Sequence, residues 1–274
     1  MKTVFFLLCF IFTSQLWSQE VVCNLPDYIS ESSGLLCIGD SVFITHNDSG
    51  NKNELYVLNT KGEVLNTCTI NGARNKDWED LCLVDDSLIY IADIGNNNNT
   101  RKDLKLYIVD LHEVLTQKES KADSINFTYP DQKEFPPSEA QKYYDAEAIC
   151  YFQNKIWIFT KNRTVPFDGV SKVYTLPKKP GKYKATVHTS LQLKASSWME
   201  DCITSVCLEQ NHLFVLTYSK IYIYQVVNGK LVWKNTRLLN RFGMWEAIHV
   251  HQSNIYLSEE KTIIAPKIYK LRWK

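Results

Sequence analysis

Lys220-Ile221-Tyr222-Ile223 places a tyrosine between aliphatic residues, two positions after a charged residue, and variants of this stretch return along the chain. The central tyrosines of the five copies are Tyr56, Tyr107, Tyr174, Tyr222 and Tyr269. Their spacings are 51, 67, 48 and 47 residues, which is the length of one four-stranded β-propeller blade. The pattern therefore predicts an all-β protein with one blade for each tyrosine.

Further strand-like segments accompany each tyrosine. Two precede it: the first leads into a polar hairpin such as Asp85-Asp86, and the second has an aromatic residue between aliphatics, as in Ile89-Tyr90-Ile91. These near-continuous apolar runs indicate strands that are covered on both faces, as in stacked blades. A more polar segment after the tyrosine, such as Lys230 to Leu239, predicts the fourth strand.

The fifth repeat reaches the end of the chain after its third strand, and Val21 to Leu25 has no place in the first repeat. We expect this segment to supply the outer strand of the last blade, because that pairing closes the ring. We predict a five-bladed β-propeller that forms a single domain over residues 19–274. A sixth blade is the alternative, but the region between Asp110 and Tyr144 has only about 19 surplus residues, and Leu111 to Lys121 is predicted to be helical.

Residues 1–18 are typical of a secretory signal, with Lys2 before the apolar run Val4 to Phe12 and a small residue at Ser18. The sequence thus predicts a secreted or periplasmic protein. No later segment has 18 uninterrupted apolar residues, so we expect no membrane span. Without Lys2 the chain has 30 basic and 30 acidic residues, and this balance argues against a nucleic-acid partner. We expect a monomer.

Seven cysteines follow the signal, and export permits disulfides. Four of them occupy the same position in successive repeats, with His249 in the fifth; they are Cys37, Cys82, Cys150 and Cys207. The symmetry of a propeller keeps equivalent positions apart, so these four are poorly placed to bond with one another. We interpret them as small buried hydrophobic residues.

Polar side chains gather where each inner strand begins and each second strand ends. In an antiparallel pair these two points are adjacent, so they share one face of the propeller near its axis. We predict a ligand pocket on this axial face, lined by Asp48, Glu79, Asp93, Arg101, Glu147, Lys161, Glu246 and Glu259.

Three of these residues, Glu79, Glu147 and Glu246, stand three positions before the Cys or His of their repeat. Crowded carboxylates repel one another unless they are compensated, and Ca²⁺ accepts six to eight oxygen ligands. We therefore predict a Ca²⁺ site with these three glutamates as ligands. In the alternative, they accept backbone hydrogen bonds and fasten one blade to the next. Arg101 either binds an anionic ligand or pairs with a nearby carboxylate.

Familiar catalytic motifs are absent: the sequence has no GxSxG elbow, no Walker loop and no HExxH motif. His46 is the one histidine that we place on the axial face. Trp78 and Trp245 each precede a pocket glutamate, and we expect them to pack between blades or to stack against a ring of a ligand.

Several motifs resemble those of a group of exported bacterial propeller proteins described as phytase-like or esterase-like. They include Asp77-Trp78-Glu79-Asp80-Leu81, Asp145-Ala146-Glu147-Ala148-Ile149 and Trp245-Glu246-Ala247-Ile248, and the full set spans nearly all of residues 19–274. The resemblance implies a propeller with an acidic central pocket, together with calcium-dependent phosphate release or ester hydrolysis. Thr204 replaces the glutamate in the fourth repeat, so the ring of acids is incomplete.

Three functions remain open. The leading one is an exported propeller whose axial pocket binds Ca²⁺ or a small polar ligand without catalysis. The second is a Ca²⁺-assisted hydrolase of phosphate esters or lactones, in which a spare carboxylate or His46 acts as the base. The third is a platform that binds another protein on its flat face.

Overall fold

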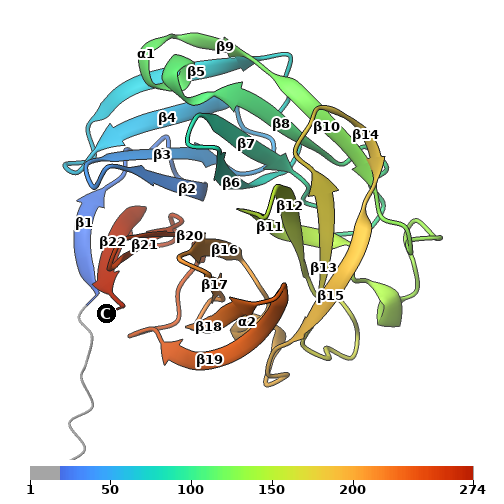
Figure 1. Cartoon of the computed structure of the whole chain (residues 1–274). Coiled ribbons are helices and arrows are strands. Elements are labelled where there is room, and N and C mark those ends of the chain that lie inside the picture. The colour runs from blue at the N-terminus through green and yellow to red at the C-terminus, as the bar shows by residue number, and fades with distance from the viewer. Residues whose placement is uncertain (1–18, 274) are drawn as a thin grey trace, which may run out of the picture.

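A computed structural model describes residues 19–273, whose strands form five sheets around a central axis (Figure 1). The predicted five-bladed β-propeller is confirmed. The five sheets contain all the strands of residues 19–273, so the six-bladed alternative is wrong. The predicted signal, residues 1–18, lies outside the described residues, and export stays a prediction. Among the described residues no helix is long and apolar enough to cross a membrane.

The first two blades have five strands each. Blade one contains β2 (Ser32–Ile38), β3 (Val42–Asn47), β4 (Glu54–Asn59), β5 (Val64–Asn71) and β9 (Glu119–Lys121). Blade two contains β6 (Trp78–Val84), β7 (Leu88–Asp93), β8 (Lys105–Asp110), β10 (Asp123–Thr128) and β14 (Gly181–Lys184). In each blade the innermost strand comes first in the chain and the later strands follow outward.

The other three blades have four strands each. Blade three contains β11 (Asp145–Phe152), β12 (Lys155–Lys161), β13 (Val170–Pro177) and β15 (Thr186–Gln192). Blade four contains β16 (Ser205–Glu209), β17 (His212–Leu216), β18 (Lys220–Val227) and β19 (Lys230–Leu238). Blade five contains β20 (Trp245–His251), β21 (Asn254–Glu259), β22 (Lys267–Arg272) and β1 (Glu20–Asn24).

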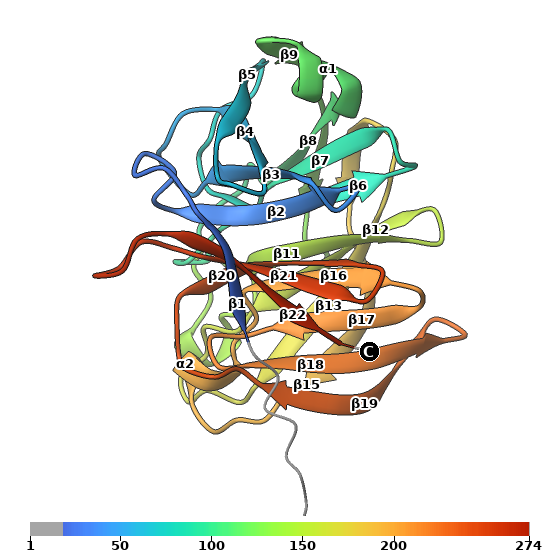
Figure 2. The same ribbon diagram turned by 90° about the vertical axis from the view of Figure 1, so that its left-hand side faces the viewer.

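The amino-terminal strand closes the ring as predicted. Strand β1 pairs antiparallel with β22 (Figure 2). In this pairing Val21 lies opposite Tyr269. The pairing gives blade five its fourth strand from the other end of the chain. The side chains of Cys23 and Leu25 are buried in the core between blades five and one.

Five apolar cores stabilise the propeller, one between each pair of neighbouring blades. Each core is formed by side chains from the facing sides of two sheets, such as Leu36 and Ile91 between blades one and two. The apolar runs in the sequence are thus explained, because every central strand is covered on both sides. Trp78 and Trp245 are fully buried in these cores, which supports the packing role.

The tyrosine repeat has a polar function as well as an apolar one. All five tyrosines are buried, and their hydroxyl groups still find partners. In blades three and four the hydroxyl donates to an aspartate that also pairs with the lysine two residues earlier. Tyr222 and Lys220 meet Asp201 at 2.6 and 2.9 Å, respectively. In these two blades the geometry explains why a charged residue precedes the tyrosine, and in blade one Glu54 itself accepts from the hydroxyl of Tyr56 at 2.9 Å.

The hairpins between first and second strands have the predicted turn chemistry. Asp85 and Asp86 have φ angles of 50° and 54°, and Gln153 and Asn154 have 48° and 63°. Such left-handed backbone conformations are tolerated best by Gly, Asn and Asp.

Two features of the surplus region differ from expectation. The helix predicted over Leu111 to Lys121 is confirmed only for α1 (Leu111–Thr116), because Glu119–Lys121 form β9, which adds a parallel strand to the outer edge of β5. Strand β14 adds to β10 in the same way. Two short helices complete the fold, α2 (Trp198–Asp201) and the 3-10 helix η1 (Glu139–Gln141).

All seven cysteines within residues 19–273 are free, and six of them are buried. Burial raises the pKa of Cys37 to about 11 and that of Cys207 to about 12, so both remain protonated thiols. Their interpretation as small hydrophobic residues is confirmed.

Closure of the ring by β1 can be tested by substituting aspartate, one variant at a time, at two positions of this strand that are two residues apart. We expect Cys23→Asp to lower the free energy of unfolding by more than about 2 kcal/mol, because it buries an unpaired carboxylate. Val21 is 51% exposed, so Val21→Asp should change stability by no more than about 0.5 kcal/mol. Urea denaturation followed by far-UV circular dichroism measures both values. Equal effects at the two positions would show that β1 does not pack into the ring.

Candidate metal centre at the propeller axis

A local irregularity aims three glutamates at the axis. The inner strand and its neighbour lose register at Glu79, at Glu147 and at Glu246, so each glutamate is the extra residue of a β-bulge. A bulge re-aims a side chain and often lies beside a functional site. Blade four has Thr204 at the matching place, and its hydroxyl donates to the carbonyl of Trp245 at 2.6 Å.

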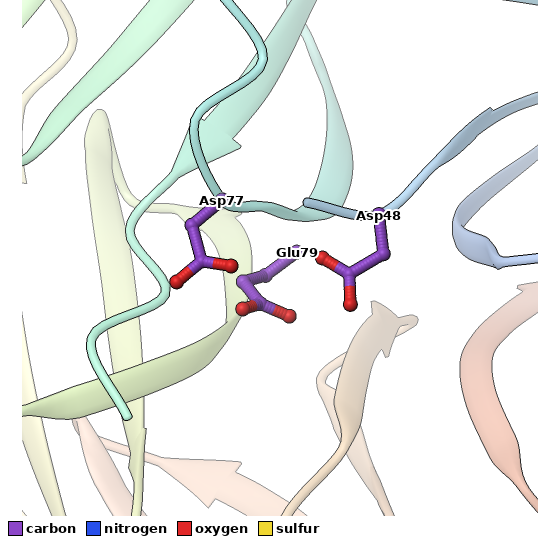
Figure 3. A group of neighbouring side chains, drawn as sticks. All are labelled: Asp48, Asp77 and Glu79. Carbon is purple, nitrogen blue, oxygen red and sulfur yellow. The ribbon is translucent and has the colours of Figure 1, made fainter. Parts of the chain in front are cut away.

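Three carboxylates from blades one and two converge beside the axis. One oxygen each of Asp48, Asp77 and Glu79 lies within 4.8 Å of the others, and the side chains face a common gap (Figure 3). Within residues 19–273 neither Asp77 nor Glu79 forms an ion pair or accepts a hydrogen bond on its carboxylate. We call these three residues the acidic triad.

Buried hydrogen bonds hold the backbone of the triad in place. The amide of Asn75 donates to the carbonyls of Asn47 and Asp48 at 2.9 Å each, and its oxygen accepts from the backbone N–H of Trp78. The N–H of Asp77 donates to the carboxylate of Asp93 at 3.1 Å. These contacts fix the loop after β3 against the start of β6.

Gly95 leaves the room that the carboxylates need. A Cβ at this position would lie 2.0 Å from Oε1 of Glu79 and 2.4 Å from Oδ2 of Asp77. Its φ angle is not in the left-handed region, so backbone conformation is not what requires glycine here. The loop therefore has glycine at the point where two triad carboxylates approach its backbone.

The charge of the triad is only partly compensated: Arg101 lowers the pKa of Asp77 and the backbone N–H of Ser49 that of Asp48, but neither outweighs the causes that raise them. Burial is the main cause that raises the pKa of Asp48 to about 8, and repulsion from Glu147 and Asp77 adds to it. Burial and nearby Asp145 raise the pKa of Asp77 to about 6. The pKa of Glu79 lies well above its ordinary value for the same reasons. A bound cation or bound protons would relieve this repulsion.

Blade three, the neighbour of blade two, contributes two cations to the axial face. Lys161 lies 3.0 Å from the carboxylate of Glu147 and donates to the hydroxyl of Tyr218 at 3.1 Å. Arg163 pairs with Asp145 at 2.6 Å and approaches Glu147 at 3.6 Å. Glu147 is thus compensated in a way that Glu79 is not.

Two further carboxyl groups border this axial region. Burial raises the pKa of Glu246 to about 7, although Lys161 and a hydrogen bond from Tyr218 oppose the shift. Burial and repulsion from Glu246 and Asp48 raise the pKa of Glu260 to about 9. Both groups can therefore carry a proton near neutral pH.

Three of the predicted pocket residues form structural ion pairs instead. Asp93 is buried and pairs with Arg101 at 2.9 Å, and Arg101 also donates to the carbonyl of Gly95 at 2.7 Å. Glu259 pairs with Arg241 and accepts from Tyr269 at 3.1 Å. In blades two and five, then, a carboxylate at the end of the second strand is neutralised by an arginine from a neighbouring loop.

The metal ligands predicted from the sequence need revision. Of Glu79, Glu147 and Glu246, the structure keeps Glu79 and groups it with Asp48 and Asp77. Glu147 and Glu246 are turned toward Lys161 and Tyr218. The sequence placed Asp77 only in a motif of the resemblance. Glu260 follows Glu259 at the end of a second strand on the axial face, but it was not among the predicted pocket residues.

His46 is not available as a base. Its Nε2 accepts from the backbone N–H of Gly34 at 3.1 Å, and Nδ1 lies 2.9 Å from the carbonyl oxygen of Asn47. The ring is fully buried against Trp78, and burial lowers its pKa to about 4. It is a neutral, structural histidine.

The blade-fastening role belongs to Asp80, the neighbour of Glu79. Its buried carboxylate accepts from the backbone N–H groups of Leu81 and Ile149 at 2.9 Å each, which joins blades two and three. Ser205 of blade four approaches the same carboxylate at 3.4 Å. The alternative considered for the glutamates thus applies to the adjacent residue.

Comparisons with known proteins support the fold alone. Glutaminyl cyclase of Myxococcus xanthus is similar over 93% of this chain and 96% of its own, with 11% identity and a TM-score of 0.55. The Dos1 propeller matches 84% of this chain and 53% of its own, with 15% identity and a TM-score of 0.40. PorZ of Porphyromonas gingivalis matches 83% of this chain and 23% of its own, with 12% identity and a TM-score of 0.38. No family model and no curated protein matches the sequence.

The raised pKa values predict that the protein without a bound cation loses stability as the pH rises. Between about pH 4 and pH 8 the folded triad binds more protons than the unfolded chain does, so the free energy of unfolding falls across this window. We expect the Tm to be roughly 5 °C or more higher at pH 5.5 than at pH 8 in EDTA. Differential scanning calorimetry measures this slope.

Asp48→Asn should flatten the pH dependence, because it removes one of the carboxyl groups whose pKa is raised. Asp123→Asn is the matched control, since Asp123 is exposed on β10. A wild-type Tm that rises from pH 5.5 to pH 8 would contradict the repulsion inferred for the triad.

Proposed function

We propose that the axial face binds Ca²⁺ through Asp48, Asp77 and Glu79. The observation that supports this most strongly is the convergence of three carboxylates without an ion pair, against a glycine that leaves them room. Oxygen ligands in this number suit Ca²⁺, which tolerates irregular geometry and completes its shell with carbonyls or water. The resemblance to phytase-like and esterase-like propellers agrees with this proposal. Together with the export signal predicted in residues 1–18, this would make the protein a secreted or periplasmic cation-binding propeller.

A cavity of about 310 Å³ adjoins the triad and gives a ligand access. Its lining includes Asp77, Asn97, Thr100 and Arg101. Lys161 and Arg163 of the adjacent blade three are already engaged with carboxylates. A small polar ligand with an anionic group would therefore find a metal on one side and amides or guanidinium groups nearby.

A Ca²⁺-assisted hydrolase of phosphate esters or lactones is the second candidate. It is favoured by Glu246 and Glu260, whose raised pKa values suit a general acid or base near neutral pH. Bound Ca²⁺ would polarise an oxygen of the substrate. One carboxylate would take a proton from the attacking water, and a protonated carboxyl group would donate one to the leaving oxygen. Screening phosphate monoesters and lactones with Ca²⁺ present separates a hydrolase from a binder.

Ca²⁺ should stabilise the wild-type protein and should not stabilise Asp77→Asn. At a concentration one hundred times the Kd, binding adds about 2.7 kcal/mol, since the ligand binds only the folded chain. For a protein of this size the expected shift in Tm is about 5 °C or more. Thermal melts at pH 7 with EDTA or with Ca²⁺ measure the shift, and isothermal titration gives the Kd.

Two variants control for charge and for geometry. Asp123→Asn changes the net charge as Asp77→Asn does but should keep the full shift. Gly95→Ala leaves every charge in place and should weaken Ca²⁺ binding at least about tenfold, because its Cβ displaces Glu79 and Asp77. If Asp77→Asn and Gly95→Ala keep the wild-type shift while melting as folded proteins, the ion binds elsewhere.

A further inference from the structure

The charge of the chain is neutral overall but unevenly distributed. Between Gly169 and Trp245 the sequence holds eleven lysine and arginine residues and three acidic residues. This segment contains β13 to β19, which form most of blades three and four together with the outermost strand of blade two, β14. The strands β14, β15 and β19 contain no acidic residue. These three strands are the outermost strands of blades two, three and four, and we call the surface that they form the basic wall. The neutral total charge of the chain does not reveal it.

The positive charge on this wall is free to meet a partner. Six of the lysines are exposed and form no ion pair within residues 19–273. They are Lys179, Lys182, Lys184, Lys194, Lys230 and Lys234. An exposed cluster of one sign attracts a ligand of the opposite sign.

The same wall presents an unpaired strand edge. Blades one and two have their outer edges covered by β9 and β14, but no strand among the described residues covers β19 of blade four (Figure 1). With nine residues, β19 is the longest strand described. Its neighbour β15 is also uncovered, and His188 of β15 lies 3.1 Å from the carbonyl oxygen of Gly229, just before β19. Such an edge can accept a further strand through its backbone groups.

Apolar side chains are exposed along this edge. Trp233 is 59% exposed and Leu238 is 74% exposed, and Val232 and Val187 are exposed beside them. An exposed aromatic and aliphatic group next to lysines is typical of a protein-binding surface. Lysine on an edge strand discourages pairing with an identical copy, and β19 has a β-bulge at Lys234 that interrupts its edge in the same sense.

We infer that β19 binds an extended, acidic segment of another protein by strand addition. Backbone hydrogen bonds to the free edge on either side of the bulge would supply affinity, and glutamate or aspartate near Lys230 and Lys234 would supply selectivity. Trp233 and Leu238 would cover apolar side chains of the same segment. This inference is independent of the proposed Ca²⁺ site.

The test uses the whole protein and a fluorescein-labelled nine-residue peptide that alternates glutamate with valine. We expect saturable binding by fluorescence anisotropy, with an affinity that falls as salt rises. Lys230→Glu/Lys234→Glu should weaken binding at least tenfold. Lys61→Glu/Lys133→Glu makes the same charge change at exposed lysines outside the segment from Gly169 to Trp245 and should alter binding no more than about threefold. Melting curves confirm that both variants fold.

A second peptide separates strand pairing from simple charge attraction. It has the same sequence with alternate amides N-methylated, and it should bind at least tenfold more weakly. Equal binding of both peptides would overturn the inference, as would a stronger affinity for heparin fragments or for phosphatidylglycerol vesicles. Sedimentation without peptide tests the edge further: a dimer that Lys230→Glu/Lys234→Glu dissolves would show that a second copy occupies β19.

Discussion

Every sheet of this protein can bury its two apolar faces only if it has a neighbour on each side. Five sheets meet that constraint by forming a ring, and the ring needs a fourth strand for its last blade. Strand β1 provides it by pairing with β22, and Ser258 of blade five then donates to the carbonyl of Ser32 in blade one at 3.1 Å. The five interface cores depend on this closure, because an open ring would expose two apolar faces.

Closure also creates the electrostatic problem at the axis. It brings together the starts of the inner strands, where bulges direct Glu79, Glu147 and Glu246 inward. The compensating cations are not distributed with the same symmetry, because Lys161 and Arg163 both come from blade three. In the described part of the chain, Asp48, Asp77 and Glu79 of blades one and two are left without an ion pair. This asymmetry explains why the acidic triad lies to one side of the axis and not at its centre.

The sequence was sufficient for the features that repeat. Tyrosine spacing, hairpin residues and the unclaimed Val21 to Leu25 predicted the blades and their closure, because each depends on local pattern or on counting. The sequence was insufficient where the conformation of a loop determines which side chain or strand a residue contacts. Glu259 and Glu260 are adjacent, yet one pairs with Arg241 and the other borders the axis. No local rule separates them, just as none predicts that β9 and β14 join the edges of earlier blades.

The acidic axis and the basic wall do not cancel each other. In blade four, β19 is separated from the inner strand β16 by β17 and β18, so three strand spacings of about 4.8 Å, roughly 14 Å in all, lie between them. The screening length at physiological salt is about 8 Å, and charges farther apart than that interact weakly. The carboxylates at the axis would therefore attract a cation, and the lysines at the wall an acidic strand, with little effect of one group of charges on the other. For that reason a balanced total charge excluded neither kind of ligand.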